Sequence, residues 1–175
     1  MIFKLGELFC GPGGIAVGAI NASIENNEYG IVHQWANDYD ANTCATYRKN
    51  ICPSNPNSVF HEDVRKFDMD KLASIDALAF GFPCNDYSVV GEQKGMDGVY
   101  GPLYSYGVKA LKKFKPMWFL AENVGGLKNA NDGKAFVDDL VLSLWNQLLN
   151  WIRLKIILMK QIIKRQMHWL LKSLN

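Results

Sequence analysis

Residues 2–14, "IFKLGELFCGPGG", decide the fold of this 175-residue chain. The mostly apolar stretch 2–9 predicts a buried strand, and the Gly- and Pro-rich residues after it predict a turn into a helix over 14–25. Because the glycines lack side chains, a ligand can approach the backbone here, near a helix N-terminus. An ordinary tight turn is the alternative. No Gly-Lys-Ser/Thr follows, so the sequence does not indicate a Walker phosphate loop.

Beyond this turn, apolar strand patterns continue to alternate with helix patterns. The further strands are expected at 30–38, 58–60, 74–82 and 117–123, and the further helices at 40–50 and about 103–114. Such alternation predicts an α/β fold with a mostly parallel sheet covered on both faces. In sheets of this kind, ligands bind at the carboxyl ends of the strands.

Composition excludes several classes of protein. With 49% hydrophobic and 21% charged residues, the chain has the balance of a soluble globular protein. Lys4 and Glu7 interrupt the first apolar stretch, and no uncharged run is long enough to span a bilayer, so we expect a cytoplasmic protein without a membrane partner. The four cysteines form no Cys-x-x-Cys pair and have no histidine at zinc-finger spacing, which argues against a metal site and a disulfide framework.

Charge divides the chain into two parts. Residues 140–175 contain six basic residues and no Asp, Glu, Gly or Pro, which leaves 13 basic and 17 acidic residues, a net of −4, in 1–139. The positive formal charge therefore belongs to the C-terminal segment alone. By composition, 1–139 is not a basic nucleic-acid-binding module.

Acidic residues follow two of the expected strands. Asp38, in "ANDYD" (36–40), has the position and the spacing after the glycine turn of a carboxylate that accepts hydrogen bonds from a ribose. A helix N-cap is the alternative role, and Asp40 suits it better. Asp63, in "HEDV", could accept from an adenine amino group, but taken singly it is more typical of a solvated loop residue.

The stretch "AFGFPCNDYSVVGEQKG" (79–95) places Cys84 after Pro83, at the end of an apolar strand and before a long polar loop. A cysteine in this position is presented rather than packed, so Cys84 is the candidate nucleophile. In "LAENVGGL", Glu122 and Asn123 end the next strand. A carboxylate beside Cys84 suits proton transfer, although a solvent-facing Glu is the simpler interpretation of Glu122 alone.

Taken in order, "FCGPGG", "ANDYD", "EDV", "GFPCNDYSVVGEQKG" and "ENVGGL" resemble the amino-terminal half of the cytosine-5 DNA methyltransferases of restriction-modification systems. The resemblance covers roughly residues 1–137. It implies a Rossmann-like S-adenosylmethionine-dependent methyltransferase fold, incomplete at its C-terminal side, with DNA as substrate.

The resemblance also assigns roles to residues. It implies that the S-adenosylmethionine site is formed by Phe9, Gly11, Gly13, Gly14, Asp38, Tyr39, Asp63, Pro83 and Leu103. Asp38 would hold the ribose, where the family usually has Glu, and Asp63 the adenine. The catalytic residues would be Pro83, Cys84, Glu122 and Asn123.

In the chemistry that the resemblance implies, the Cys84 thiolate adds to C6 of cytosine while Glu122 interacts with N3, so that C5 becomes able to take a methyl group. Loss of the C5 proton and elimination of the thiolate then release 5-methylcytosine. The base must leave the duplex for this, and the loop 85–101 is expected to close over it.

The sequence also departs from the family. The target-recognition region, a Gln-x-Arg-x-Arg segment and the C-terminal piece that completes the cofactor domain are not recognisable, and we expect two parts, a partial catalytic domain at 1–139 and a basic tail at 140–175. The tail has an apolar stripe opposite Lys and Arg, typical of an amphipathic helix that binds a membrane surface, an acidic partner or DNA. Its abrupt change of composition favours a frameshift or truncation instead.

Three functions stay open at this point. The first is a DNA cytosine-5 methyltransferase that is inactive as a fragment. The second is a silent cofactor-binding remnant, or one half of a split enzyme that needs a separate recognition polypeptide. The third is a tRNA methyltransferase. The target sequence cannot be inferred.

Overall fold

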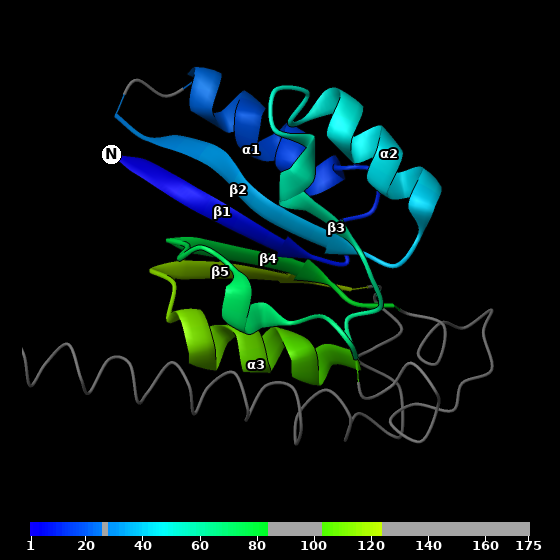
Figure 1. The fold of residues 1–175 in the computed structure, drawn as a ribbon. Helices are drawn as coiled ribbons and strands as arrows, with labels where there is room; N and C mark the ends of the chain where they lie inside the picture. The colour runs from blue at the N-terminus through cyan, green and yellow to red at the C-terminus, as the bar shows by residue number, and fades with distance from the viewer. Residues whose placement is uncertain (26–27, 84–102, 124–175) are drawn as a thin grey trace, which may run out of the picture.

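The computed structural model describes residues 1–25, 28–83 and 103–123. Its centre is a sheet of five parallel strands in the order β3-β2-β1-β4-β5 (Figure 1). The strands are β1 (Ile2–Leu8), β2 (Gly30–Asp38), β3 (Val59–His61), β4 (Ala77–Gly81) and β5 (Trp118–Glu122). The helices are α1 (Gly14–Glu25), α2 (Ala41–Asn50) and α3 (Tyr104–Phe114), with short 3-10 turns η1 (Pro56–Ser58) and η2 (Met69–Lys71).

The described elements confirm the predicted alternation of strands and helices. Each expected strand and helix is present, with bounds that differ from the expected ones by at most three residues. Asp40 is the N-cap of α2, since its carboxylate accepts from the Thr43 amide at 2.8 Å. The predicted division at residue 139, and the helical stripe after it, lie outside the described residues.

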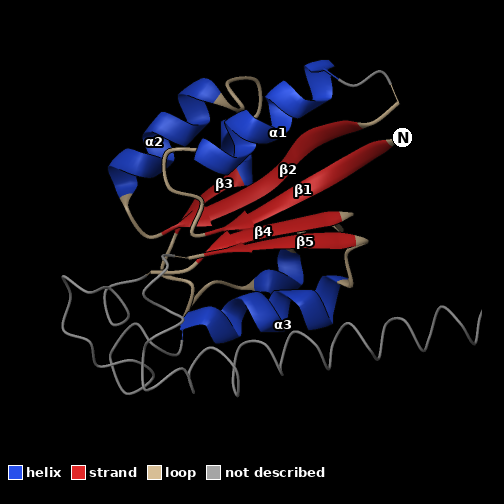
Figure 2. Cartoon of the chain, turned by 180° about the vertical axis from the view of Figure 1, so that it is seen from behind, coloured by secondary structure: helices blue, strands red, loops and turns tan. Residues whose placement is uncertain are grey.

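The sheet is covered on both faces, as predicted. Helices α1 and α2 lie on one face and α3 on the other, which Figure 2 shows from behind. Along β4 the residues alternate: Leu78 and Phe80 join the core under α3, whereas Ala77 and Ala79 join the cluster under α1. The larger side chains therefore fill the α3 side.

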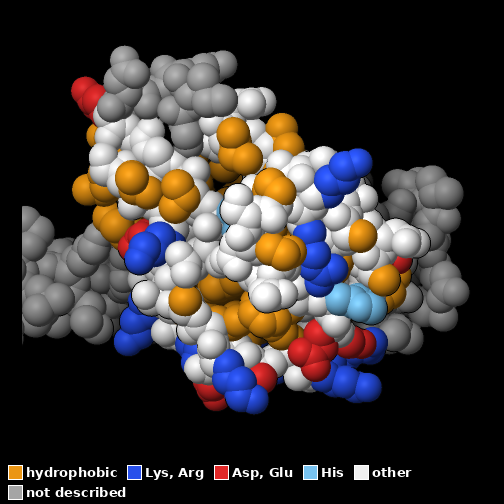
Figure 3. All heavy atoms as spheres, turned by 45° about the horizontal axis from the view of Figure 1, so that its top comes forward, with side chains coloured by type: hydrophobic (Ala, Val, Ile, Leu, Met, Phe, Trp, Pro, Cys, Tyr) orange, Lys and Arg blue, Asp and Glu red, His pale blue; other side chains and the backbone are white. Residues whose placement is uncertain are grey.

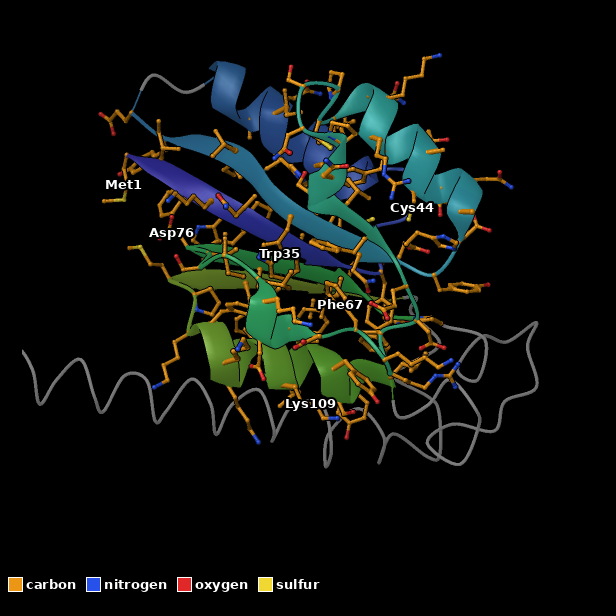
Figure 4. All side chains as sticks on the ribbon, in the orientation of Figure 1. Met1, Trp35, Cys44, Phe67, Asp76 and Lys109 are labelled. Carbon is orange, nitrogen blue, oxygen red and sulfur yellow. The ribbon has the colours of Figure 1, made fainter. Side chains whose placement is uncertain are left out.

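A bulge in β2 changes which side chains face each layer. The pairing of β1 with β2 runs from Leu5–His33 directly to Gly6–Trp35 and skips Gln34. His33 therefore contacts Tyr47 of α2, whereas Trp35 lies in the core on the α3 side and donates from Nε1 to the Ala73 carbonyl at 3.0 Å. Figure 4 labels Trp35 and Phe67 in this layer.

The strand order contains a reversal that is important for ligand binding. From β1 the chain moves outward to β2 and β3, and then returns across the sheet to β4 and β5 on the other side of β1. Parallel sheets of this kind bind ligands outside the carboxyl ends of the strands where the order reverses, here β1 and β4. Among the described residues, no helix is long and apolar enough to cross a membrane.

Candidate active site

The turn after β1 has the backbone geometry that its glycines predict. Phe9 has a φ of 54°, Gly11 of 53° and Gly13 of 101°, all in the left-handed region. The Gly13 amide donates to the Cys10 carbonyl at 3.2 Å, which closes the turn directly before α1. For Phe9, a non-glycine residue, this conformation is uncommon and costs free energy.

One side of this turn is packed and the other is open. A Cβ on Gly13 would lie 2.9 Å from Ile51 Cγ1 and 3.2 Å from Tyr47 Cδ2, so α2 and the residue after it support the turn from below. A Cβ on Gly11 or Gly14 would meet no heavy atom within 4 Å. The open side is where the sequence predicts close approach of a ligand to the backbone.

Asp38 connects the end of β2 to the turn. Its Oδ2 accepts from the Gly11 amide at 2.9 Å and its Oδ1 from the Asp40 amide at 3.0 Å. A carboxylate offers about four lone-pair sites, so the half-buried group keeps acceptor capacity for the hydroxyls of a ribose. Tyr39 follows with 70% of its surface exposed. The structure thus brings Asp38 to the glycine turn, whereas its ribose contact stays a prediction.

Asp63 lies near Asp38 but already has a partner. The Glu62 amide donates to the Asp38 carbonyl at 3.0 Å, which brings the end of β3 beside the end of β2. The Arg65 guanidinium donates to both Asp63 oxygens, from Nε at 2.9 and 3.0 Å, and with its backbone amide it holds the pKa of that carboxyl below its usual range. An adenine amino group would have to share this carboxylate with Arg65.

The ends of β4 and β5 meet on the other side of β1. Gly81 pairs with Glu122, and a Cβ on Gly81 would lie 3.3 Å from Glu122 Oε2, so this carboxylate reaches over β4. Glu122 is exposed. Asn123 Nδ2 donates to the Phe82 carbonyl at 2.8 Å, directly before Pro83. Asn123 therefore braces the backbone that leads to the candidate nucleophile.

Of the predicted site residues near this edge, Leu103 is described and Cys84 is not. Leu103 is 7% exposed and packs in the core with Phe82. Cys84 and the loop 85–101 lie outside the described residues, so the distance from Cys84 to Glu122 stays a prediction. Cys10, the other cysteine near the site, is buried, and burial, followed by the charge of Asp38, raises the pKa of its thiol. A thiol of this kind is a poor nucleophile.

Sequence reasoning missed a buried polar pair beneath the turn. Glu7 of β1 is 1% exposed, and its Oε2 forms a hydrogen bond with the Tyr47 hydroxyl. Burial raises the pKa of Glu7 to about 7, and the hydrogen bond to Tyr47 opposes the rise. The signal in the sequence is a charged residue within an otherwise apolar strand.

The described edge combines two features that could receive a ligand. It has an open glycine turn at a helix N-terminus, and an acid that is anchored to this turn but keeps acceptor sites. Among the described residues, no group of three or more His, Cys, Asp or Glu could hold a metal ion.

Comparison with known proteins identifies the family. The model of the C-5 cytosine-specific DNA methylases matches residues 3–144. The chain belongs to this family. A type II methyltransferase, M.BbvI of Brevibacillus brevis, is 58% identical over 145 residues, which are 78% of this chain and 39% of that protein. M.PspPI of Psychrobacter sp. strain TA137 is 38% identical over 133 residues, 75% of this chain and 29% of that protein.

Membership of the C-5 cytosine-specific DNA methylases confirms the resemblance that the motifs indicated. The chain spans less than half the length of these two relatives. The Dnmt2 methyltransferase of S. pombe has a similar fold, with a TM-score of 0.54 and 15% identity over 78% of this chain and 39% of that one. The predicted Rossmann-like methyltransferase fold is therefore confirmed.

Proposed function

We propose that this chain is the cofactor-binding and catalytic half of a DNA cytosine-5 methyltransferase. One observation carries the proposal: in a member of the family, the glycine turn, Asp38, Pro83 and the Glu122–Asn123 pair come to the same carboxyl edge of the sheet, around the reversal between β1 and β4. Each motif is tens of residues from the next, and only the parallel sheet brings them together.

The cofactor would be S-adenosylmethionine, which supplies an electrophilic methyl group. The open backbone of Gly11 and Gly14 would face it, with Asp38 accepting from the ribose hydroxyls. Tyr39, largely exposed beside Asp38, would pack on the adenine, and Asp63 would accept from its amino group in competition with Arg65. Phe9 and Pro83 would border the site, and Leu103 would support it from the core.

The reaction would proceed at the ends of β4 and β5. Asn123 donates to the Phe82 carbonyl and so fixes the backbone before Pro83, which would present Cys84. The Cys84 thiolate would bond to C6 of a cytosine while Glu122 interacts with N3. The exposed position of Glu122 leaves its carboxylate accessible to an extruded base. The partner would be DNA, and the place of action would be the bacterial cytoplasm.

Binding of S-adenosylhomocysteine tests the cofactor site. We expect calorimetry to detect binding, and Asp38→Ala to weaken it by about tenfold or more, because a charge-assisted contact to a diol contributes about 1.5–3 kcal/mol. Asp76→Ala is the matched control, since Asp76 also accepts from a backbone amide, that of Lys4, but at the opposite edge of the sheet. Absence of heat from the folded chain would contradict the site.

Transfer of labelled methyl groups tests the catalytic assignment and separates it from a silent remnant. We expect little transfer to duplex DNA by this chain alone, because base flipping costs a few kcal/mol that phosphate and groove contacts must offset. Transfer that appears with a separately expressed C-terminal half, and disappears in Cys84→Ala, would support a split or interrupted enzyme. No transfer with that half would favour the remnant.

A further inference from the structure

Beneath the glycine turn, four side chains form a continuous polar chain through the apolar layer between the sheet and α2. Glu7 Oε2 contacts the Tyr47 hydroxyl, which lies 3.1 Å from His33 Nδ1. His33 Nε2 lies 2.7 Å from Ser58 Oγ, and Ser58 Oγ donates to the Asn55 carbonyl at 2.7 Å. These hydrogen-bonded side chains thus connect β1, α2, β2 and η1.

The last contact fixes the direction of the hydrogen bonds. A backbone carbonyl only accepts, so the single Ser58 hydroxyl hydrogen belongs to Asn55. His33 Nε2 must then donate to Ser58 Oγ, which leaves Nδ1 of a neutral imidazole as an acceptor. In this arrangement Tyr47 donates its hydrogen to Nδ1, and a protonated Glu7 carboxyl donates to Tyr47. With Glu7 ionised, Tyr47 instead donates to Glu7 Oε2, the direction that lowers the pKa of Glu7.

The two other proton distributions are less favourable. If His33 carried the extra proton, Glu7 could be ionised, but burial lowers the pKa of His33. If these four side chains together lost one proton, every hydrogen bond between them would reverse its direction. Ser58 would then have to leave the Asn55 carbonyl to donate to His33. The buried Glu7 Oε1, which has no hydrogen-bond partner in the described structure, would then be part of a full carboxylate.

Within the described part of the chain, no positive charge compensates Glu7. Tyr47 and Cys44 face this region from α2, His33 from β2, Cys10 from the turn, and the Asp38 carboxylate lies beyond Cys10. Among the described residues, no Lys or Arg pairs with Glu7. The Arg48 guanidinium instead donates to the carbonyls of Pro56 and Val59.

We propose that Glu7 retains its proton in the folded chain, and that Glu7 and Tyr47 act through this directed chain as positioning residues for the glycine turn. Tyr47 connects these polar side chains to the turn. Its ring lies directly against Gly13, since a Cβ there would be 3.2 Å from Tyr47 Cδ2, and its hydroxyl lies between Glu7 and His33. Ionisation of Glu7 reverses the bonds that hold this ring. The part of the inference that concerns the cofactor rests on the proposed function.

The proton itself is measured first, on the full chain with ¹³C-labelled Glu carboxyl groups. We expect the Glu7 resonance, assigned by its absence in Glu7→Gln, to titrate with a midpoint near the pKa of about 7. A midpoint at or below the ordinary 4.5 would overturn the proposal. This titration is measured on the wild-type chain without a bound cofactor, and Glu7→Gln serves only to assign the resonance.

Stability gives an independent measurement. Between the ordinary pKa of 4.5 and about 7, the unfolded chain releases a proton that the folded chain keeps, so stability falls as pH rises through this window. His33, with its lowered pKa, acts in the opposite direction at acidic pH, so the comparison is with Glu7→Gln, whose amide remains a donor to Tyr47. The unfolding constant of the wild-type chain, relative to this variant, should rise about tenfold per pH unit in the window and level off above it.

Glu62→Gln, the same chemical change at an exposed carboxylate, is the matched control and should keep the wild-type profile. A Glu7→Gln variant with the wild-type pH profile would contradict the proposal.

Affinity for S-adenosylhomocysteine tests positioning. We expect binding about tenfold weaker at pH 8 than at pH 6 for the wild-type chain and for Glu62→Gln, because about a tenth of Glu7 remains protonated at pH 8. Glu7→Gln should bind equally at both pH values, and Tyr47→Phe weakly at both. A pH dependence that survives in Glu7→Gln would refute positioning. No binding at any pH would refute the proposed cofactor site, while the titration still decides the protonation of Glu7.

Discussion

At the scale of single residues, the glycines of the turn have different functions although they are close in sequence. Gly13 combines a positive φ with close packing against Tyr47 and Ile51, so it is a structural requirement. Gly14 has an ordinary φ and faces open space, so no contact within the described fold demands a glycine there. The proposed approach of the cofactor to the backbone would require this side of the turn to stay free of side chains.

Alanine substitutions separate these functions. We expect Gly13→Ala to lower the free energy of unfolding by about 1–3 kcal/mol, because the new methyl group clashes and the backbone is strained. Gly14→Ala should change it by less than about 0.5 kcal/mol, yet weaken binding of S-adenosylhomocysteine. Chemical denaturation and calorimetry on both variants measure these effects. Equal loss of stability in the two would show that the open side is packed in solution.

At the scale of elements, the contact between α3 and β4 depends on an unusually close approach. A Cβ on Gly107 of α3 would lie 2.4 Å from the Phe80 ring, so the helix rests directly on this buried side chain. Phe80 also stacks on Phe119 of β5, with ring centroids 6.4 Å apart. The glycine thus sets the distance between the helix and the strands β4 and β5, which lead to Pro83 and Glu122.

Because of this contact, helix propensity and packing predict opposite effects at Gly107. Alanine is the better helix former by about 1 kcal/mol, but we expect Gly107→Ala to destabilise the chain by about 1–3 kcal/mol through overpacking. Gly18→Ala in α1, where no heavy atom lies within 4 Å of the new methyl group, should stabilise it by up to about 1 kcal/mol. Thermal unfolding followed by circular dichroism compares the two. A Gly107→Ala variant as stable as Gly18→Ala would mean that α3 can move away from β4.

At the scale of the whole molecule, the charge balance of the sequence differs between the described domain and the C-terminal segment. Residues 1–139 have a net charge of −4, and the six basic residues of 140–175 account for the positive total. Figure 3, which brings the top of the Figure 1 view forward, shows Lys and Arg side chains spread among apolar and acidic ones. Non-specific attraction of DNA should therefore depend on the C-terminal segment rather than on the described sheet.

Neutralising the six basic residues of 140–175 with Gln should abolish most of the non-specific binding to mixed-sequence duplex DNA at low salt. The wild-type chain should lose affinity steeply as salt rises, since each neutralised phosphate contributes about −0.9 to the slope of log K against log salt. A variant with Gln at Lys109 and Lys112, exposed on α3, is the control and should keep most of the affinity. If the control lost as much as the tail variant, the described domain would contribute a basic surface.

The sequence alone determined the order of strands and helices, the parallel sheet and the family, because these depend on local apolar periodicity, on Gly and Pro at turns and on short motifs. It also identified Asp40 as a cap, since a cap depends on position relative to one strand end and one helix. The role of Cys84 stays a prediction on the same basis.

Only the tertiary structure decided what lies beneath that edge. The bulge at Gln34 turns His33 toward α2 and Trp35 toward α3, although an unbroken strand would place both on one face. The same folding brings Glu7, Tyr47 and Ser58 to His33 from separate elements. Hydrogen bonds between residues 14 to 40 positions apart, and the pKa values that burial sets, depend on three-dimensional packing, which no local pattern records.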